Sequence, residues 1–149
     1  MNYFIQEITA TETYPVRHIV LRAGKPIESC RFEGDELPST HHFGYFLDNQ
    51  LIGLVSLFES ENLLLGGEKS FQIRGMAVLD SHQKKGIGNA LIQEAEAFCK
   101  KQNTTLIWFN ARTSAVGFYK KLGYGIVGSE FEIKEVGPHF LMFKKNLRQ

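Results

Sequence analysis

Two glycines at the start of a predicted helix are the first residues whose types and spacing point to chemistry. Gly86 and Gly88 follow a predicted strand and a short turn, in the run Gln83-Lys84-Lys85-Gly86-Ile87-Gly88. Glycines at a helix start let backbone N–H groups approach a ligand closely, and the helix N-terminus carries about half a positive charge. Lys84 and Lys85 add local positive charge. The segment predicts a site for an anion such as a pyrophosphate, although a tight turn alone would also explain the glycines.

Two common phosphate-binding motifs do not fit this segment. The dinucleotide-binding motif GxGxxG requires a third glycine or alanine three residues after Gly88, where the chain has Leu91. It also requires an acidic residue about twenty positions further on, where Trp108, Phe109 and Asn110 stand. The phosphate loop GxxxxGK(S/T) is absent, because residues 66–70 read Gly-Gly-Glu-Lys-Ser. Neither kind of nucleotide site is therefore expected here.

A second run further along the chain completes a pair of motifs. It reads Asn110-Ala-Arg-Thr-Ser-Ala-Val-Gly-Phe-Tyr-Lys-Lys-Leu-Gly-Tyr. An asparagine ends a predicted strand there, and the helix that follows carries Ala, then Phe-Tyr, then Gly-Tyr. Together with Gln83-x-x-Gly86-x-Gly88, this run resembles the two hallmark motifs of the GNAT superfamily of acetyl-CoA-dependent N-acetyltransferases. The order of the motifs and their separation also match, and the resemblance covers nearly the whole chain.

This resemblance implies both a fold and an activity. The fold would be α/β (α+β), a single GNAT domain over residues 1–149, with a mixed, mostly antiparallel sheet of about six or seven strands flanked by about four helices. The activity would be transfer of an acetyl group from acetyl-CoA, as cosubstrate, to a primary amine of a small molecule or peptide. Attack would be direct, since neither Cys30 nor Cys99 lies in a motif that activates a thiol.

The resemblance also implies roles for individual residues. Backbone groups of Met76, Ala77 and Val78 would pair with the pantetheine arm of acetyl-CoA, and one N–H there would polarise the thioester carbonyl. Asn110 would contact the pantetheine or the cofactor amides. Tyr119 would give a proton to the departing CoA thiolate, because an unperturbed tyrosine stays protonated at neutral pH. The pyrophosphate would be held by the residues at the helix start, namely Gln83, Lys84, Lys85, Gly86, Ile87 and Gly88.

The general base is not assigned by the resemblance. Histone-acetylating members of the family use a glutamate on the central strand, but Gln72 occupies that position here and residues 71–79 contain no acidic residue. A glutamine cannot accept a proton at neutral pH. The remaining candidates are His41, His42, Glu132, His139 and a chain of water molecules. The missing glutamate also leaves open the alternative of an acyl-CoA-binding module with little catalysis.

Two features give different indications of the acceptor. In the family, the loop after the first helix and the last hairpin form the acceptor site, and an acidic loop would favour a cationic amine. That loop carries the acidic residues Glu28, Glu33, Asp35 and Glu36, with Arg31 as the only opposing charge. Arg74 on the central strand could instead bind the carboxylate of an amino-acid-like acceptor. The candidate acceptor-binding residues are Arg74, His42 and His139.

The composition excludes several other classes of protein. The chain has 149 residues and a formal net charge of +1, without the basic excess of a protein that binds nucleic acid by neutralising phosphates. No apolar run approaches the roughly 18 residues of a membrane span, and the N-terminus lacks a secretory signal. The two cysteines indicate neither a disulfide framework nor a metal site. We expect a cytoplasmic protein that binds neither nucleic acid nor membranes, with aromatic strands near the end of the chain that could form a homodimer interface.

Hydrophobic periodicity predicts the elements that position these residues. The expected strands lie at 3–8, 42–47, 51–58, 71–79, 104–110, 126–134 and 140–144. The expected helices lie at 13–22, 86–101 and 113–123, the first with Val16, Ile19 and Val20 on its buried face and the last capped by Thr113 and ended by Gly123. Residues 23–40 are expected to form a long loop of the kind that serves a binding site. Gly75 lies inside a predicted strand and suggests a bulge or a close approach there.

Overall fold

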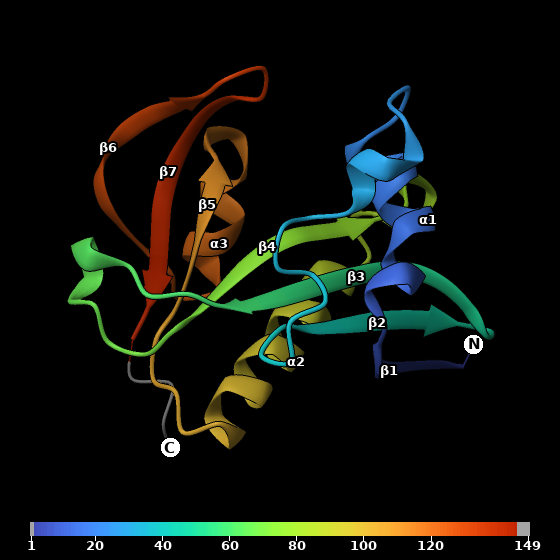
Figure 1. Ribbon diagram of the computed structural model, residues 1–149, viewed down its shortest axis with the longest axis horizontal. Coiled ribbons are helices and arrows are strands. Elements are labelled where there is room, and N and C mark those ends of the chain that lie inside the picture. Colours follow the sequence, from blue (N-terminus) through green and yellow to red (C-terminus); the bar gives the residue numbers. More distant parts are fainter. Residues whose placement is uncertain (1, 146–149) are drawn as a thin grey trace. The chain divides into compact units, whose positions relative to one another are not determined.

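Seven strands and three α-helices alternate along the part of the chain that the computed structural model describes, residues 2–145 (Figure 1). The strands are β1 (Tyr3–Ile8), β2 (His41–Leu47), β3 (Gln50–Glu59), β4 (Phe71–Val78), β5 (Ile107–Arg112), β6 (Gly125–Ile133) and β7 (Gly137–Lys144). The helices are α1 (Ala10–Leu21), α2 (Ile87–Lys101) and α3 (Val116–Lys121). The strands form one sheet in the order β1-β2-β3-β4-β5-β7-β6. No helix among the described residues is long and apolar enough to cross a membrane.

The sheet is mixed, which confirms the predicted fold class. β4 and β5 pair in parallel, whereas the pairs β1–β2, β2–β3, β5–β7 and β6–β7 are antiparallel. The predicted number of helices, about four, was too high, because residues 2–145 contain three α-helices. In the long loop after α1, only the short 3₁₀ helix η1 (Ile27–Cys30) forms. The two glycines and two prolines of that loop oppose the propagation of an α-helix.

The contacts divide the chain into two compact units, which are described separately. The first contains Met1–Glu59 and Ile73–Phe98, and the second contains Ser60–Gln72 and Cys99–Gln149.

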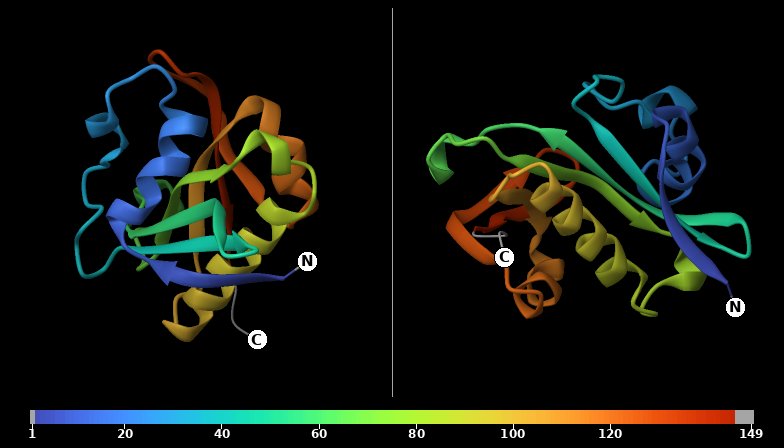
Figure 2. Two further views of the ribbon diagram at one scale, coloured as in Figure 1. Left: turned by 90° about the vertical axis from the view of Figure 1, so that its right-hand side faces the viewer. Right: turned by 90° about the horizontal axis from the view of Figure 1, so that it is seen from below.

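In the first unit, α1 and α2 cover opposite faces of the strands (Figure 2). The α1 face is closed by a cluster of buried apolar side chains from β1, α1, β3 and β4, namely Ile8, Val16, Leu54 and Ala77. On the other face, the Phe98 ring of α2 packs against the Phe43 ring, with centroids 5.4 Å apart. This sandwich fixes the position of β4 and of the loop that leads from β4 into α2.

Helix α1 begins three residues earlier than the hydrophobic pattern predicts. Thr9 and Glu12 form a reciprocal capping box: the Glu12 N–H donates to the Thr9 hydroxyl at 3.2 Å, and the Thr9 N–H donates to the Glu12 carboxylate at 2.8 Å. The predicted buried face was wrong at Ile19, which is 61% exposed. Thr13 and Arg17 are buried beside Val16 instead, because the helix turns a polar side chain toward a partner in the loop.

Gly75 produces an irregularity within β4, as its position suggests. Its φ of +71° lies in the left-handed region, and a Cβ there would come within 2.7 Å of the Phe32 ring. Side chains of a regular strand alternate between the two faces. Arg74 and Ala77 are an odd number of residues apart, yet both face the α1 side, Arg74 against Phe32 and Ala77 in the apolar cluster. The irregularity at Gly75 therefore shifts the alternation of the strand.

The second unit is built on β5, β7 and β6. Trp108, Leu106, Leu141 and Leu65 form its buried cluster on one face, and α3 lies beside β5 (Figure 1). The predicted cap at Thr113 was wrong: α3 begins at Val116, and the Thr113 hydroxyl donates to the Glu130 carboxylate at 2.7 Å. The predicted stop at Gly123 is confirmed, with a φ of +96°.

Candidate functional site

The loop between β4 and α2 is held at its start by Gln83. The Gln83 side-chain amide donates to the Val78 carbonyl at 3.0 Å and to the Asp80 carboxylate at 3.1 Å. These bonds tie the loop to the end of β4. Lys84 and Gly86 both have positive φ, +62° and +84°, so two residues in the left-handed region precede the helix. Lys85 and Gly86 are exposed.

The start of α2 offers unused backbone donors. The Ala90 N–H donates to the Gly86 carbonyl at 3.0 Å, which is the first bond of the helix. The amides of the preceding helical residues, Ile87 to Asn89, have no acceptor within the helix, as at any helix N-terminus. A Cβ at Gly86 would contact nothing within 4 Å, so the space beside this backbone is open. The arrangement has the donors, the open approach and the partial positive charge that an anion requires.

The three predicted pantetheine-binding residues lie just before this loop, at the end of β4. Ala77 is buried in the apolar cluster beneath α1, while Met76 and Val78 are half-buried. The Ala77 carbonyl oxygen would lie 3.3 Å from a Cβ at Gly53 of β3, so β3 packs tightly against the end of β4 at this glycine. The first unit thus brings together all the predicted cofactor residues from Met76 to Gly88.

Asn110 and Tyr119 belong to the second unit, where they lie on opposite faces of β5. Asn110 is exposed and pairs with Leu141 of β7, and it shares its face with Trp108 because side chains alternate along a strand. The Tyr119 ring packs instead against Phe109, whose centroid is 4.4 Å away. The structure therefore does not bring these two side chains together on one surface of the strand.

Tyr119 lies in a partly buried aromatic cluster. Its ring contacts Phe109, Phe118 and Tyr124. Burial raises the pKa of the Tyr119 hydroxyl to about 12, because removal from water disfavours the phenolate. Within residues 2–145 this hydroxyl has no hydrogen-bond partner. It is a protonated donor that is not engaged elsewhere in the described chain.

His42 is buried and both of its ring nitrogens are engaged. Its Nε2–H donates to the Asp35 backbone carbonyl at 2.9 Å, and its Nδ1 accepts from the Ser56 hydroxyl at 2.7 Å. The Ser56 oxygen in turn accepts from the Arg17 guanidinium at 3.0 Å. Burial is the largest cause that lowers the pKa of His42, so the ring is neutral at pH 7. In this arrangement His42 orders the loop after α1 and has no lone pair left to accept a proton from an amine.

His139 offers a different geometry. It is 4% exposed, and its Nδ1–H donates to the Gly137 carbonyl at 2.8 Å. This bond fixes the tautomer in which Nε2 carries the lone pair. No other described residue bonds to that nitrogen. Of the other candidate bases, His41 bonds through Nδ1 to the Glu7 carboxylate at 2.6 Å, and Glu132 is exposed on β6.

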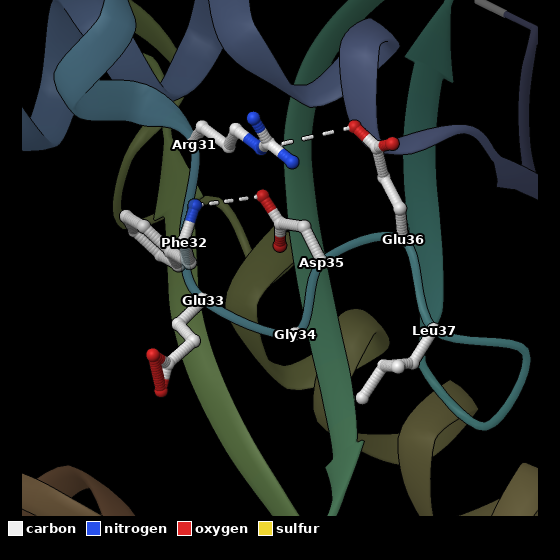
Figure 3. Close-up of a pocket in the computed structure, with 7 residues that line it drawn as sticks. All are labelled: Arg31, Phe32, Glu33, Gly34, Asp35, Glu36 and Leu37. Carbon is white, nitrogen blue, oxygen red and sulfur yellow. Dashed lines mark hydrogen bonds and ion pairs between the residues drawn. The ribbon is translucent and has the colours of Figure 1, made fainter.

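The loop after α1 forms a pocket with a volume of about 470 Å³ (Figure 3). It is lined by Arg31, Phe32, Glu33, Gly34, Asp35, Glu36 and Leu37. The predicted acidic rim is incomplete, because Asp35 is buried, accepting from the Phe32 N–H at 2.9 Å and from Arg17. Glu36 is weakly paired with Arg31 at 4.0 Å on the exposed side of the loop. The remaining negative charge at the loop surface comes from Glu28, Glu33 and Glu36.

Arg74 extends from β4 toward this loop. Its guanidinium carbon lies 4.8 Å from the centroid of the Phe58 ring and 5.5 Å from that of Phe32. Sequence reasoning did not find Phe32, Phe58 or the buried Arg17, although they form the surroundings of Arg74. An aromatic residue in a loop and an arginine in a helix carry no local signal of such a contact, since both are most often exposed or packed elsewhere.

The comparisons with known proteins agree with the predicted family and fold. The sequence model of the Acetyltransferase (GNAT) family matches residues 4–124, which include segments of both units. An uncharacterised N-acetyltransferase of Bacillus subtilis (strain 168), YitI, is 33% identical over 140 residues, which make up 94% of each chain.

Solved structures of acetyltransferases share the fold at low sequence identity. The ribosomal-protein-S18-alanine N-acetyltransferase of Escherichia coli superposes with a TM-score of 0.76 at 14% identity, over 97% of this chain and 94% of that one. An aminoglycoside 6'-N-acetyltransferase gives a TM-score of 0.75 at 15% identity, over 95% of this chain and 96% of that one. Since the family match and the similarity to YitI both extend over most of the sequence, the chain belongs to the GNAT family of acetyltransferases and is an acyltransferase.

Proposed function

We propose that this enzyme transfers an acetyl group from acetyl-CoA to a primary amine of a small molecule or peptide. The observation that carries the proposal is the start of α2, where positive φ at Gly86 and free helical amides follow directly on β4. These groups would hold the pyrophosphate of the donor, with Lys84 and Lys85 adding positive charge. The family match, which includes segments of both units, supports a single acetyltransferase domain.

The rest of the donor would be bound by residues of β4 and β5. Backbone groups of Met76, Ala77 and Val78 would pair with the pantetheine arm, and an N–H there would stabilise the oxyanion that forms at the thioester carbonyl. Asn110, with its exposed side-chain amide, would contact the cofactor amides. Coenzyme A is named as the bound ligand of the aminoglycoside 6'-N-acetyltransferase that shares this fold, which supports a CoA thioester as donor.

The reaction is proposed as a direct attack. The neutral amine forms a C–N bond to the acetyl carbon, the C–S bond breaks, and the nitrogen loses one proton to a base. The leaving CoA sulfur takes a proton from the Tyr119 hydroxyl, which then regains one from solvent. The raised pKa of Tyr119 keeps it protonated over the working range of pH, although it also makes the phenol a weak acid. Tyr119 would therefore first donate a hydrogen bond to the sulfur as negative charge develops there, and then give up its proton.

The geometry favours His139 among the candidate bases. Its Nε2 lone pair is unused by the described residues and its orientation is fixed by Gly137, whereas both nitrogens of His42 are occupied. A water molecule held by His139 Nε2 could carry the proton from the amine. His139 and His42 were grouped together by sequence, and their different hydrogen bonds separate them.

The alternative, an acyl-CoA-binding module with little catalysis, is favoured by one feature, the glutamine at position 72 in place of an acidic residue. The two proposals differ in a simple assay. Steady release of CoA with any member of a panel of amines supports the transferase, and cofactor binding without release supports the module.

The donor site is tested by thermal unfolding with and without acetyl-CoA. A ligand that binds only the folded protein raises the melting temperature. We expect acetyl-CoA to raise it in the wild type and not in Gly86→Glu, which places a carboxylate among the proposed phosphate donors. Gly24→Glu is the matched control, because Gly24 also has a positive φ, +78°, with nothing within 4 Å of a Cβ. A shift retained in Gly86→Glu, or no shift in the wild type, would refute the proposed donor site.

A further inference from the structure

We propose that the acceptor amine carries a carboxylate group, and that Arg74 of β4 binds this carboxylate and selects for it. The inference rests on the proposed function, since it names the class of acceptor for the same reaction. It is carried by a half-buried cation that lacks an anion, by the excess of positive charge around it, and by its position along β4.

Arg74 is a charged residue without a polar partner. It is half-buried, and within residues 2–145 its guanidinium has no hydrogen bond and no ion pair. Its neighbours are the faces of Phe58 and Phe32, which stabilise a cation weakly and leave its N–H donors unused. Burial lowers the pKa of Arg74 from its ordinary value; the nearby Asp35 carboxylate favours the charged form, whereas Arg17 and Arg22 oppose it. A partly desolvated guanidinium normally has a carboxylate or phosphate partner.

The surroundings of Arg74 have more positive than negative charge. Three guanidiniums, of Arg17, Arg22 and Arg74, lie within 3.9, 5.1 and 5.5 Å of the centroid of the Phe32 ring. The buried carboxylate there is that of Asp35, which is already bonded to both terminal nitrogens of Arg17 at 2.6 and 3.0 Å. Glu33 favours the charged form of Arg74 electrostatically but makes no ion pair with it and is exposed to solvent. One further anion at Arg74 would balance the cluster.

The position of Arg74 suits an acceptor. Arg74 precedes Met76, the first residue proposed to bind the acyl-donor arm, by two positions. Two residues of chain span at most roughly 7 Å, so Arg74 and the proposed site of the acyl-donor arm are close enough for one small acceptor to contact both. The planar guanidinium can bind a carboxylate through two parallel hydrogen bonds, which a lysine cannot reproduce.

The test compares each common L-amino acid with its amide as acceptor, following CoA release. The two members of a pair differ in the carboxylate and in the basicity of the amine beside it, so the recognition of the carboxylate is measured by the change in their ratio of kcat/KM between the wild type and a variant. We expect the best acid to exceed its amide by roughly 10- to 100-fold. In Arg74→Gln this ratio should fall roughly 10- to 100-fold, mainly through loss of activity on the acid. Arg74→Lys should give an intermediate ratio.

Arg31→Gln is the control variant. Arg31 is an exposed arginine of the loop after α1, toward which Arg74 extends, and it is weakly paired with Glu36. It should leave the ratio unchanged. The effect of acetyl-CoA on the melting temperature is measured in every variant and should be the same in all, since Arg74 is not part of the proposed donor site.

Three results would overturn the inference. The wild type could acetylate amides or simple amines as well as the acids; Arg74→Gln could lower activity on acid and amide equally; or no acid could react while acetyl-CoA still stabilises the protein. In each of these results the proposed donor site stands. Loss of the acetyl-CoA effect in the wild type would instead refute the proposed function, and the inference with it.

Discussion

Arg17 in the middle of α1 and Asp35 in the following loop form a buried, two-pronged ion pair, with N–O distances of 2.6 and 3.0 Å. Arg17 also donates to the Cys30 carbonyl at 2.8 Å, so one side chain fixes the loop at two points. Asp35 completes the link by accepting from the Phe32 N–H. The buried pair therefore ties the loop that carries the pocket to the helix before it.

Loss of one partner of this pair should be strongly destabilising. Asp35→Asn leaves the Arg17 charge buried without its counterion, and removal of one partner of a buried pair costs about 3–5 kcal/mol. We expect a fall of this size in the free energy of unfolding, measured with urea. Glu36→Gln is the control, because the Arg31–Glu36 pair is exposed and such pairs contribute about 0–1 kcal/mol. Equal effects of the two substitutions would contradict a structural role for the buried pair.

Removal of the Tyr119 hydroxyl should slow the chemical step. Tyr119→Phe retains the ring that packs on Phe109 but removes the proposed donor to the leaving sulfur, so kcat should fall about 100-fold or more. The effect of acetyl-CoA on the melting temperature should persist. Tyr124→Phe changes a neighbouring ring that also packs on Phe109 and should retain kcat. Unchanged turnover in Tyr119→Phe would remove Tyr119 from the mechanism.

The raised pKa of Tyr119 gives a further expectation at high pH. An unfolded tyrosine ionises near pH 10, whereas Tyr119 ionises at about 12 in the folded protein. The stability that this difference contributes is fully present below pH 10 and is lost as the pH rises toward 12. In an ultraviolet titration of the folded protein, Tyr119→Phe should remove a transition near pH 12. If the variant instead removes a transition near pH 10, the hydroxyl is not shielded from water.

His42 should make stability depend on pH in the acid range. Its pKa is lowered in the folded protein, so the unfolded chain binds more protons as the pH falls. Its contribution is fully present above about pH 6.5 and is lost as the pH falls toward the lowered pKa, by at most about 1.4 kcal/mol per pH unit. Urea unfolding between pH 7.5 and 5 should show this slope in the wild type but a smaller one in His42→Gln. The same slope in both proteins would show that His42 does not titrate on unfolding.

A base at position 139 should be needed for the full rate. His139→Asn retains a side-chain N–H that can donate to Gly137 but removes the Nε2 lone pair. We expect kcat/KM to fall about 100-fold at neutral pH. Acetyl-CoA should still stabilise the variant. A wild-type kcat/KM in His139→Asn would assign the proton to another group or to water.

Much of the fold could be predicted because it depends on local pattern. The apolar spacing of Ile87, Leu91 and Ala95 predicted α2 to its last residue, and all three are buried. The start of α1 was missed although the capping-box spacing of Thr9 and Glu12 was visible in the sequence. Contacts between distant residues were not predictable in this way. Asp35 was interpreted as part of an acidic loop surface because nothing near it in the sequence indicates Arg17 as its partner.

The same distinction between local patterns and distant contacts applies to the candidate site. Residues of the two motifs could be proposed from the sequence because their spacing within one turn or helix is what the chemistry requires. The general base was left open because it depends on which nitrogen of a histidine is already bonded, and only the structure distinguishes His42 from His139.

The shifted alternation at Gly75 has a consequence for how this enzyme can change. It divides β4 into two short segments, with Arg74 in the first and Ala77 in the second. The alternation of side chains in the second segment is shifted relative to that in the first. A substitution at position 74 changes the side chain that contacts the loop after α1. It leaves in place the packing of Ala77 beneath α1 and the start of the loop that leads into α2. Acceptor preference could therefore diverge among relatives by single substitutions before the glycine, with the machinery for the acyl donor inherited intact.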